Sequence, residues 1–244
     1  MDAAPRVRIV VQARMGSSRF PGKILASLAG EPMLTRVVQR LAATDQYAHA
    51  AIEITVATTV LPEDDATALL CETLDVTCLR GSENDVLSRY LDATADLADD
   101  DIVIRATADN PLYCPRRTAH LLEHHRRTGS DYTGVVDLSP VVPEVIRVGA
   151  LRESTSLGVD AYCREHVTPA LRRRPEGYRV DVLPANWNGL RPEIRLTLDT
   201  PEDHRRMAAL FANLGTAADT ATMNEVYAHA EMLLSAAAGG ELCP

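Results

Sequence analysis

Paired cysteines, a leader segment and long apolar runs are all missing from this sequence. The five cysteines form no CxxC pair and show no zinc-ligand spacing. We therefore expect reduced thiols and no disulfide framework, as in a protein of the cytoplasm. The residues that follow Met1 lack the pattern of a signal peptide, and no apolar run reaches membrane-spanning length. These features predict a cytoplasmic protein that has no membrane partner.

Positive charge is also in short supply. Lys and Arg number 25 against 34 Asp and Glu, which gives a formal net charge of -9. A general nucleic-acid binder needs a basic face to attract phosphates, so the balance disfavours that class of protein. Individual anions can still bind where Arg and Lys are locally concentrated.

The segment from Ile9 to Lys23 (IVVQARMGSSRFPGK) joins an apolar strand to a loop rich in cations. The β-branched residues before Gln12 predict a buried first strand. The loop then contains glycines and three cations, namely Gly16, Gly22, Arg14, Arg19 and Lys23. Glycines let backbone N–H groups converge on an anion, while Arg and Lys supply the charge that holds it. This pattern predicts a polyphosphate site rather than a solvated basic loop.

The loop nearly matches a P-loop, and the mismatch is informative. A Walker A loop needs four residues between its glycines and a Ser or Thr after its Lys. Here five residues separate Gly16 from Gly22, and Ile24 follows Lys23. Because no hydroxyl is in place for magnesium, a metal would have to bind elsewhere. The chain is not expected to be a P-loop NTPase.

Strand, loop and helix alternate through the first half of the sequence. Further strands are predicted at 52–57, 76–79 and 102–105, and helices are predicted to open at Pro32 and Pro62 and to span 83–97. Such alternation predicts one α/β domain over residues 1–244, with a parallel sheet covered by helices on both faces. Ligands of such sheets bind beyond the carboxyl ends of the strands. The crevice there should collect polar residues that follow the strands, namely Arg14, Thr58, Arg80 and Asp109.

The second half is less regular. An apolar, proline-interrupted stretch over 135–148 suggests a β-excursion or an oligomer contact. Residues 193–198 alternate as a strand, and Pro201 then opens a helix that either Asp199 or Thr200 could cap. Residues 235–244 are rich in Ala and Gly and are expected to fray.

Two aspartates are candidate metal ligands. Asp109 and Asp199 each follow a predicted strand directly, and carboxylates at that position can hold Mg²⁺ against phosphates. An Asx-Pro turn is the alternative for Asp109, and a plain helix cap is the alternative for Asp199. Glu165 and His166 could act as a general base, since His titrates near neutral pH, but a packed helix-end histidine is the simpler interpretation.

Five motifs taken together resemble a known family. QARMGSSRFPGK, RGSENDVLSRY, RATADNPL, REHVTP and LDTPED, in this order, are similar to the cytidylyltransferases of the spore-coat polysaccharide biosynthesis type. These are relatives of the CMP-ulosonate synthetases that activate Kdo and sialic acid. The resemblance covers about residues 7–212. It implies a Rossmann-like nucleotidyltransferase fold with a central, mostly parallel sheet flanked by helices, and Mg²⁺-dependent transfer of CMP from CTP with release of pyrophosphate.

The resemblance also implies roles for individual residues. Arg14, Lys23 and Asp109 would be catalytic, and Asp109 and Asp199 would hold the metal. CTP would be bound by Ala13, Arg14, Gly16, Ser18, Arg19, Lys23, Thr58, Arg80, Ser82 and Asp85. Glu144, Glu165 and His166 would lie near the acceptor.

One segment departs from the family pattern. Relatives commonly carry a segment like GLDVEVF where this chain has VVPEVIR, Val141 to Arg147. Glu144 matches, but the preceding acid is replaced by Val142 beside Pro143. The acceptor could therefore be a ulosonic acid, a sugar phosphate or a phosphonate. Since relatives dimerise through this region, the stretch at 135–148 predicts a small dimerisation excursion and a homodimer.

The sequence thus predicts a cytidylyltransferase that acts on CTP and a small acidic acceptor. Two alternatives remain open. One is a nucleotidyltransferase that uses another NTP, and the other is an inert nucleotide-binding module. An inert module would have no need of both Asp109 and Asp199.

Overall fold

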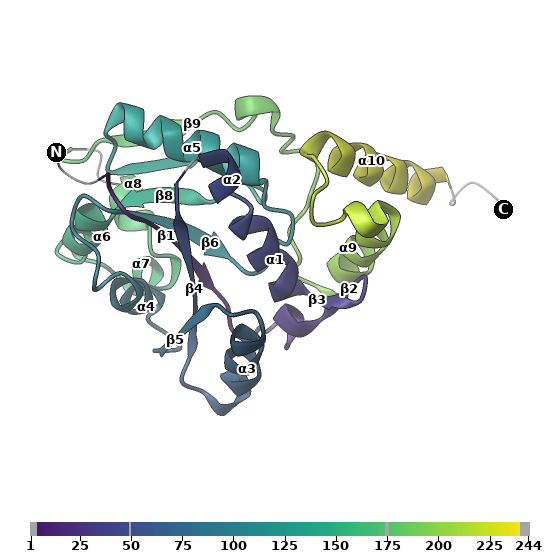
Figure 1. The fold of residues 1–244 in the computed structure, drawn as a ribbon, viewed down its shortest axis with the longest axis horizontal. Coiled ribbons are helices and arrows are strands. Elements are labelled where there is room, and N and C mark those ends of the chain that lie inside the picture. Colours follow the sequence, from purple (N-terminus) through teal and green to yellow (C-terminus); the bar gives the residue numbers. More distant parts are fainter. Residues whose placement is uncertain (1–3, 49, 174–175, 240–244) are drawn as a thin grey trace.

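The computed structural model describes residues 4–48, 50–173 and 176–239. Its main feature is a seven-stranded sheet with the order β5-β4-β1-β6-β8-β7-β9 (Figure 1). The strands are β1 (Val7–Gln12), β4 (Ile52–Thr59), β5 (Thr77–Gly81), β6 (Ile102–Thr107), β7 (Tyr132–Val135), β8 (Glu144–Arg147) and β9 (Val180–Leu183). Neighbours among β5, β4, β1 and β6 pair in parallel, which confirms the parallel sheet predicted for the first half.

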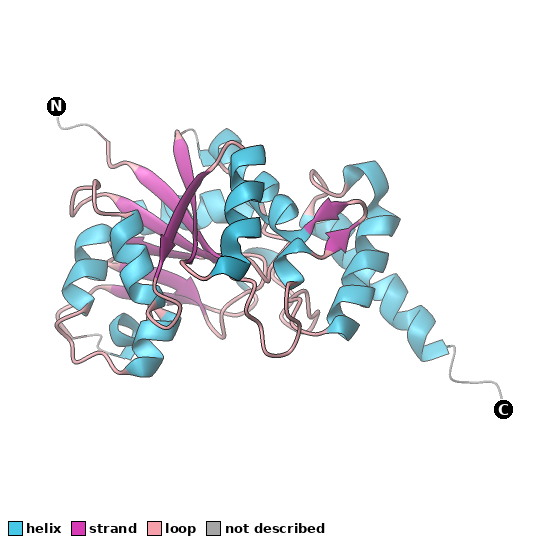
Figure 2. Ribbon diagram, turned by 90° about the horizontal axis from the view of Figure 1, so that it is seen from below, coloured by secondary structure: helices cyan, strands magenta, loops and turns pink. Residues whose placement is uncertain are grey.

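Helices cover both faces of the sheet (Figure 2). The longer ones are α1 (Met33–Ala42), α3 (Asp65–Thr73), α4 (Val86–Ala93), α5 (Pro115–Thr128), α9 (Pro201–Leu214) and α10 (Met223–Gly239). Shorter ones are α2 (Asp45–Ala48), α6 (Val148–Ser154), α7 (Ala161–His166) and α8 (Pro169–Arg173), and a two-stranded ribbon pairs β2 (Ser27–Leu28) with β3 (Glu31–Pro32). None of the helices in the described ranges is both long and apolar enough to cross a membrane.

The alternating directions of the side chains of β1 explain why the sheet has a hydrophobic core on each face. Ile9 and Val11 face a core that includes side chains of α1, α5, α9 and α10, whereas Val10 faces a second core with α4, α6 and α8. Because successive side chains of a strand point to opposite faces, a run of β-branched residues must be covered on both sides. The sequence pattern of this strand therefore already required helices on both faces.

The predicted boundaries need small corrections. Strand β4 runs on through Thr59, and β5 ends at Gly81 rather than at residue 79. Helix α4 is shorter than the predicted 83–97, because Asp85 caps its first turn by accepting a hydrogen bond from the Ser88 amide. Its other end is set by Thr94, whose φ of -119° leaves the helical range.

The stretch at 135–148 is not an exposed excursion. Strand β8 lies inside the sheet, antiparallel to both β6 and β7. Val141, Val142, Val145 and Ile146 are buried in the chain's own cores, whereas Val136 and Leu138 are exposed. The apolar pattern was produced by a strand buried on both faces, so it does not by itself indicate an oligomer contact.

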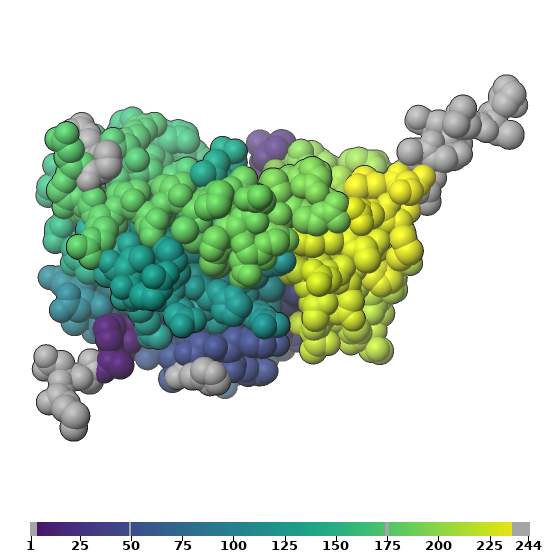
Figure 3. All heavy atoms as spheres, turned by 90° about the horizontal axis from the view of Figure 1, so that it is seen from above, coloured from purple at the N-terminus to yellow at the C-terminus, as the bar shows by residue number. Residues whose placement is uncertain are grey.

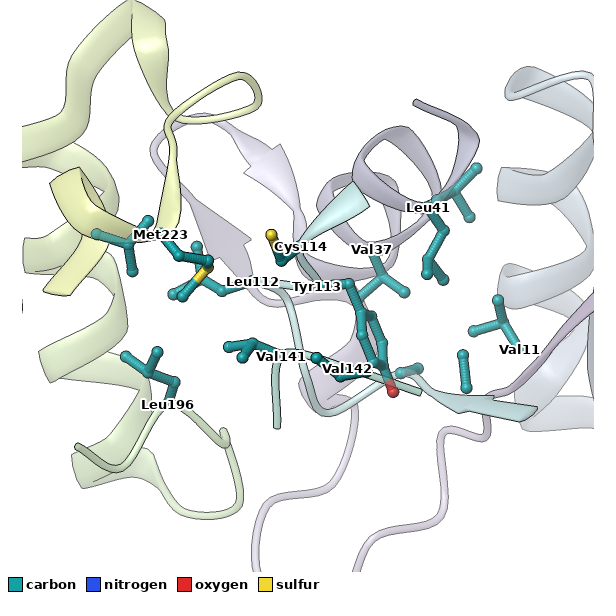
Figure 4. Close-up of a cluster of buried hydrophobic side chains, with 14 of the residues drawn as sticks. Val11, Val37, Leu41, Leu112, Tyr113, Cys114, Val141, Val142, Leu196 and Met223 are labelled. Carbon is teal, nitrogen blue, oxygen red and sulfur yellow. The ribbon is translucent and has the colours of Figure 1, made fainter. Parts of the chain in front are cut away.

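The segment at 193–198 is not a strand of the described sheet. Its alternate side chains, Ile194, Leu196 and Leu198, are buried, which produced the strand-like pattern. They pack beside α9 and α10 instead of joining the ladder, and Figure 4 shows Leu196 and Met223 close to Leu112 and Val141. The last helix reaches Gly239, so the predicted frayed tail begins with helical residues, and 240–244 lie outside the described part. Figure 3 shows the described C-terminal residues, in yellow, packed against the body of the molecule.

Candidate active site

The cationic loop between β1 and β2 is closed by its own backbone. The Gly22 amide donates to the Met15 carbonyl at 2.9 Å, and Gly22 adopts a φ of 73° that favours glycine. The Met15 amide in turn donates to Asp64 Oδ1 at 2.7 Å. The Met15 segment of the loop is therefore held both by Gly22 and by Asp64.

Asp64 is a positioning residue that the sequence did not reveal. Its side chain is fully buried, and it also accepts a hydrogen bond from the Thr59 hydroxyl at the end of β4. From the sequence, Asp64 is one of three acids at a helix start, where acids suit the helix dipole. The pattern could not show that its carboxylate turns back toward the loop.

Two loop cations face the two candidate metal ligands. Lys23 Nζ lies 3.0 Å from Asp199 Oδ1 and 3.7 Å from Asp109 Oδ2. Arg19 contacts the same Asp199 oxygen at 3.0 Å. The Leu198 amide donates to the Asp109 carbonyl at 2.9 Å, which links the two segments. The structure thus brings together Arg19, Lys23, Asp109 and Asp199, although the segment before Asp199 is not a strand.

The capping alternative for Asp199 is excluded by the geometry of α9. The hydroxyl of Thr200 accepts from the Asp203 amide, and the Asp203 carboxylate accepts from the Thr200 amide, which is a complete capping box. Asp199 takes no part in it through its side chain. The Asp199 carboxylate is 15% exposed and forms ion pairs with the loop cations Arg19 and Lys23.

The oxygens of this pair fit a hard cation. Asp109 Oδ1 is buried and has no hydrogen-bond partner among the described residues. Magnesium prefers one or two carboxylates together with phosphate oxygens and water, rather than a cage made only of protein. No cluster of three or more His, Cys, Asp or Glu ligands occurs in the described part of the chain. A shared protein–phosphate site therefore suits these residues better than a purely protein site.

A second side of the loop opens on a cavity of about 340 Å³. Arg14 lies at its rim, 3.8 Å from Glu83, and both side chains are partly exposed. Glu165 and His166, at the end of α7, line the same cavity and are both exposed. The structure therefore brings the predicted acceptor pair close to the start of the loop. His166 also packs against the Tyr162 ring, with centroids 4.3 Å apart.

Several predicted CTP residues have other partners. Thr58 is fully buried in β4, and its hydroxyl has no partner in the described ranges. Arg80 turns toward the loop after β4, where it donates to the carbonyls of Thr59 and Leu61 and pairs with Asp65. These two side chains are therefore not displayed on the cavity as expected.

Ser82 and Asp85 organise the start of α4. The Ser82 hydroxyl accepts from the Asp85 amide, and the Asp85 carboxylate caps the helix and pairs with Arg164 of α7. The residues that line the cavity here are their neighbours Glu83, Asn84 and Val86. Ala13, Gly16 and Ser18 lie in the loop as expected, and Ala13 lines the cavity.

Glu144 is an internal residue and not a surface for the acceptor. Its carboxylate, 6% exposed, pairs with Arg105 and accepts hydrogen bonds from Tyr132 and Thr168. Burial works against the charge of Arg105, but the Glu144 carboxylate overrides it and raises the pKa of that guanidinium. Since Glu144 is fully engaged, its predicted contact with the acceptor is wrong in this structure.

Comparison with known proteins agrees with this geometry. The sequence matches the family model described as Cytidylyltransferase over residues 8–236. It is 31% identical to the spore coat polysaccharide biosynthesis protein SpsF of Bacillus subtilis (strain 168), over 87% of this chain and 89% of that protein. It is also 27% identical to a 3-deoxy-manno-octulosonate cytidylyltransferase of Polynucleobacter necessarius, over 86% of this chain and 97% of that one.

Solved structures show the same fold. A cytidylyltransferase from Leptospira borgpetersenii superposes with a TM-score of 0.82 at 24% identity, and the match covers 95% of this chain and 96% of that one. A CMP:2-keto-3-deoxy-manno-octonic acid synthetase, solved in complex with CTP, gives a TM-score of 0.64 at 18% identity, with 85% and 99% covered. The matches to sequence and family span nearly the whole chain, and they include the loop, both aspartates and the helices that position them. This protein belongs to the cytidylyltransferase family of nucleotidyltransferases.

Proposed function

We propose that this enzyme transfers CMP from CTP to a small acidic acceptor, with Mg²⁺ as cofactor and pyrophosphate as the leaving group. The observation that carries the proposal is the position of Lys23, whose ammonium contacts both Asp109 and Asp199 beneath the cationic loop. The loop is held by its own backbone and by Asp64, so its amide groups and cations are fixed in position for a polyphosphate.

The loop cations bind and orient the triphosphate. Arg19 is 61% exposed and can exchange its contact with Asp199 for a phosphate oxygen. Lys23 is largely buried and remains a fixed positive charge where negative charge grows on the leaving pyrophosphate. An acceptor oxygen would attack the α-phosphorus in line, and positioning and electrostatics supply most of the acceleration.

Asp109 and Asp199 would hold the metal together with oxygens of the triphosphate. When bound, Mg²⁺ neutralises phosphate charge and acts as a Lewis acid. Asp109 Oδ1, which has no hydrogen-bond partner within the described ranges, gives the pair a ligand atom for the metal. With a cation there, Arg19 would be free to exchange Asp199 for phosphate, while Lys23 would stay held by the Leu198 carbonyl.

The charges that line the cavity beside the loop support this cavity as the place where the acceptor binds. Arg14 offers a cation to this cavity, and Glu165 and His166 line it as well. We propose that His166 or Glu165 contacts the acceptor there, with the acceptor drawn from ulosonic acids, sugar phosphates and phosphonates. Glu144 no longer enters this list, because its carboxylate is engaged inside the fold.

The test has two steps. Calorimetric titration with CTP, UTP, ATP and GTP in the presence of Mg²⁺ should give the tightest binding for CTP. A pyrophosphate-release screen with CTP and the three acceptor classes should then identify one class that supports turnover. Tighter binding of ATP or GTP than of CTP would contradict the assignment of cytosine as the base. The absence of pyrophosphate release with all three acceptor classes would favour an inert nucleotide-binding module.

A further inference from the structure

A cavity of about 610 Å³ lies apart from the cationic loop. Its walls are the end of α1, helix α2, the start of α5 and the connection from α9 to α10. It shares no lining residue with the cavity beside the loop, among the described residues. Cys114, which precedes α5, and Met223, which opens α10, both line it and are labelled in Figure 4. Sites for small molecules commonly measure about 300–1,000 Å³, so this cavity has room for a ligand of its own.

The ionisable side chains that line this cavity are mostly basic. They are Arg40, Arg116, Arg117, His120 and, as the single carboxylate among the described lining residues, Asp219. Asp219 already pairs with Arg36 of α1. The three lining arginines form no ion pair within residues 4–48, 50–173 and 176–239. Because the whole chain carries a net charge of -9, this local excess of positive charge is not a general property of its surface.

Two of these arginines are buried and remain uncompensated. Arg40 is 1% exposed and Arg117 is 8% exposed. Both donate only to backbone carbonyls, which are those of Tyr113, Ala218 and Ala221 for Arg40 and those of Asn188 and Gly189 for Arg117. Arg117 Nη1 has no hydrogen-bond partner in the described part of the chain. Because the protein interior screens charge weakly, both guanidinium groups attract an anion in the cavity without having to touch it.

Two helices also begin at this cavity. The 14-residue helix α5 has neither a side-chain cap nor an acid in its first turn, where Arg116 and Arg117 follow Pro115. The amides of these two arginines have no acceptor among the described residues. Asn224, in the first turn of α10, lines the cavity as well. The start of a helix carries partial positive charge and free N–H groups, an arrangement that binds phosphate. Here the two helix starts add to the field of the buried arginines.

Arg116 and His120 are the side chains available for direct contact. Arg116 is exposed, and its guanidinium can bind two phosphate oxygens at once. His120 lies one turn later on the same face of α5. Asn188 Nδ2 donates to His120 Nδ1 at 2.9 Å, so the neutral ring carries its hydrogen on Nε2 and can donate from there.

The opposite wall of the cavity is less polar. It includes Ala43, Tyr47, Ala221 and Met223. Tyr47 is 51% exposed and offers the face of an aromatic ring. A phosphate group alone would leave this part of the cavity unused, so the lining suits a ligand that also has an organic part.

We propose that this cavity binds a phosphorylated small molecule, with its phosphate at the start of α5 near Arg116 and His120 and its organic part near Tyr47. The ligand differs from the substrates of the catalytic loop in where it binds, and the proposal does not depend on the proposed function. Inorganic phosphate and phenyl phosphate are suitable probes, because they share the anionic group and differ only in the organic part.

The experiment is a titration of the full-length, ¹⁵N-labelled protein with each probe, followed by amide chemical shifts in NMR spectra. The amides of Arg117 and Asn224 should shift and saturate together, and phenyl phosphate should saturate them at a lower concentration than inorganic phosphate. In Arg116→Glu the affinity reported by these amides should fall at least ~10-fold, because a carboxylate replaces the charge-assisted contact. A Glu in the first turn of a helix suits its dipole, so the melting temperature should not fall. Arg116→Gln should give a smaller loss in the same direction.

Arg126→Glu is the matched control. It makes the same change of charge in the last turn of the same helix, and Arg126 does not line this cavity. Its affinity for both probes should equal that of the parent. The amides of Gly16 and Gly22 report binding of the same probes at the catalytic loop, and their response should be the same in Arg116→Glu as in the parent.

Three results would overturn the proposal. The first is the absence of saturable shifts at Arg117 and Asn224 in the parent. The second is an affinity at these amides that Arg116→Glu and Arg126→Glu lower equally, since the probes would then respond only to net charge. The third is equal affinity for inorganic phosphate and phenyl phosphate, which would exclude an organic ligand and leave a site for the free anion.

Discussion

At the scale of the residue, the site depends on one ammonium group shared by two carboxylates. Lys23 lies between Asp109 and Asp199, which come from opposite halves of the chain. Their proximity could be predicted from the sequence only in part. Asp109 follows β6 as expected, but Asp199 follows a segment that is not a strand, and a backbone hydrogen bond from Leu198 brings it into place.

The first prediction concerns these aspartates. Asp109→Asn and Asp199→Asn preserve side-chain shape and remove the charge that a metal requires. Each variant should fold normally and bind CTP, but should release pyrophosphate at least ~100-fold more slowly, about 2.7 kcal/mol of lost transition-state stabilisation. Single-turnover kinetics with a coupled pyrophosphate assay would measure the effect.

The neighbouring carboxylate supplies the control for that experiment. Asp203 is buried and serves the capping box of α9, so Asp203→Asn should lower the melting temperature with little effect on the rate per folded enzyme. Near-parental turnover in Asp199→Asn would remove that residue from the metal site and leave Asp109 to hold the ion alone.

A second prediction at this scale concerns a histidine remote from the site. Burial lowers the pKa of His125 to about 4, and its Nδ1 shares a hydrogen bond of 2.9 Å with Thr133 Oγ1. The unfolded chain, with a pKa of about 6.5, binds a proton more readily than the folded one. The stability contributed by the neutral imidazole is therefore complete above about pH 6.5 and is lost as pH falls toward 4.

A pKa lowered to about 4 corresponds to about 3 kcal/mol of unfolding free energy. Urea unfolding of the parent and of His125→Gln should give curves that run parallel above pH 7. Between pH 6.5 and 4 the parent should lose stability more steeply than the variant. Equal slopes over that interval would show that the imidazole does not titrate differently on folding.

At the scale of the element, sequence patterns predicted correctly those helices and strands whose position depends on nearby residues and not on contacts with distant parts of the chain. Strand β1, helix α1 and the start of α9 lie where their patterns predict, because apolar periodicity and capping act within a few residues. The patterns failed where an alternation of apolar and polar residues arises from packing outside a sheet. Residues 193–198 alternate because every second side chain is buried beside α9, while β8 is a short strand that the sequence did not separate from a longer apolar stretch.

The capping box of α9 leads to a prediction for the element. Thr200→Ala removes the hydroxyl that accepts from the Asp203 amide and leaves that amide without its partner. The cost should be about 1 kcal/mol of unfolding free energy. Denaturant unfolding would measure it, with Thr73→Ala as a control, since Thr73 is exposed near the end of α3 and bonds only the Leu69 carbonyl of its own helix. A cost no larger than that of the control would mean that the cap contributes little.

At the scale of the molecule, the class of fold could be predicted because alternating strands and helices leave few arrangements. The order of the parallel strands then follows from crossover rules and helix coverage. The other half of the sheet could not be predicted. β8 enters between β6 and β7 and runs antiparallel, and its place depends on the buried contact between Glu144 and Arg105 and not on any local pattern.

The burial of β8 changes the argument for the predicted homodimer. The apolar stretch at 135–148 no longer supplies an exposed surface, apart from Val136 and Leu138, which are 40% and 42% exposed. Val182, on the edge strand β9, is also exposed. An uncovered edge strand with apolar neighbours offers unpaired backbone groups to a second chain, so the expected interface moves to this edge.

We therefore predict that the protein sediments as a dimer at tens of micromolar, the order of magnitude at which an interface of ordinary size is saturated. Val182→Lys places a charge on the edge of β9 and should shift the population to monomer without lowering the melting temperature of the monomer. The matched control is Leu69→Lys, because Leu69 is an exposed apolar residue of α3 on a different part of the chain. Sedimentation of the parent as a monomer at that concentration would contradict the predicted homodimer. A dimer that survives Val182→Lys but not Leu69→Lys would place the interface on α3, beside β5 at the opposite edge of the sheet.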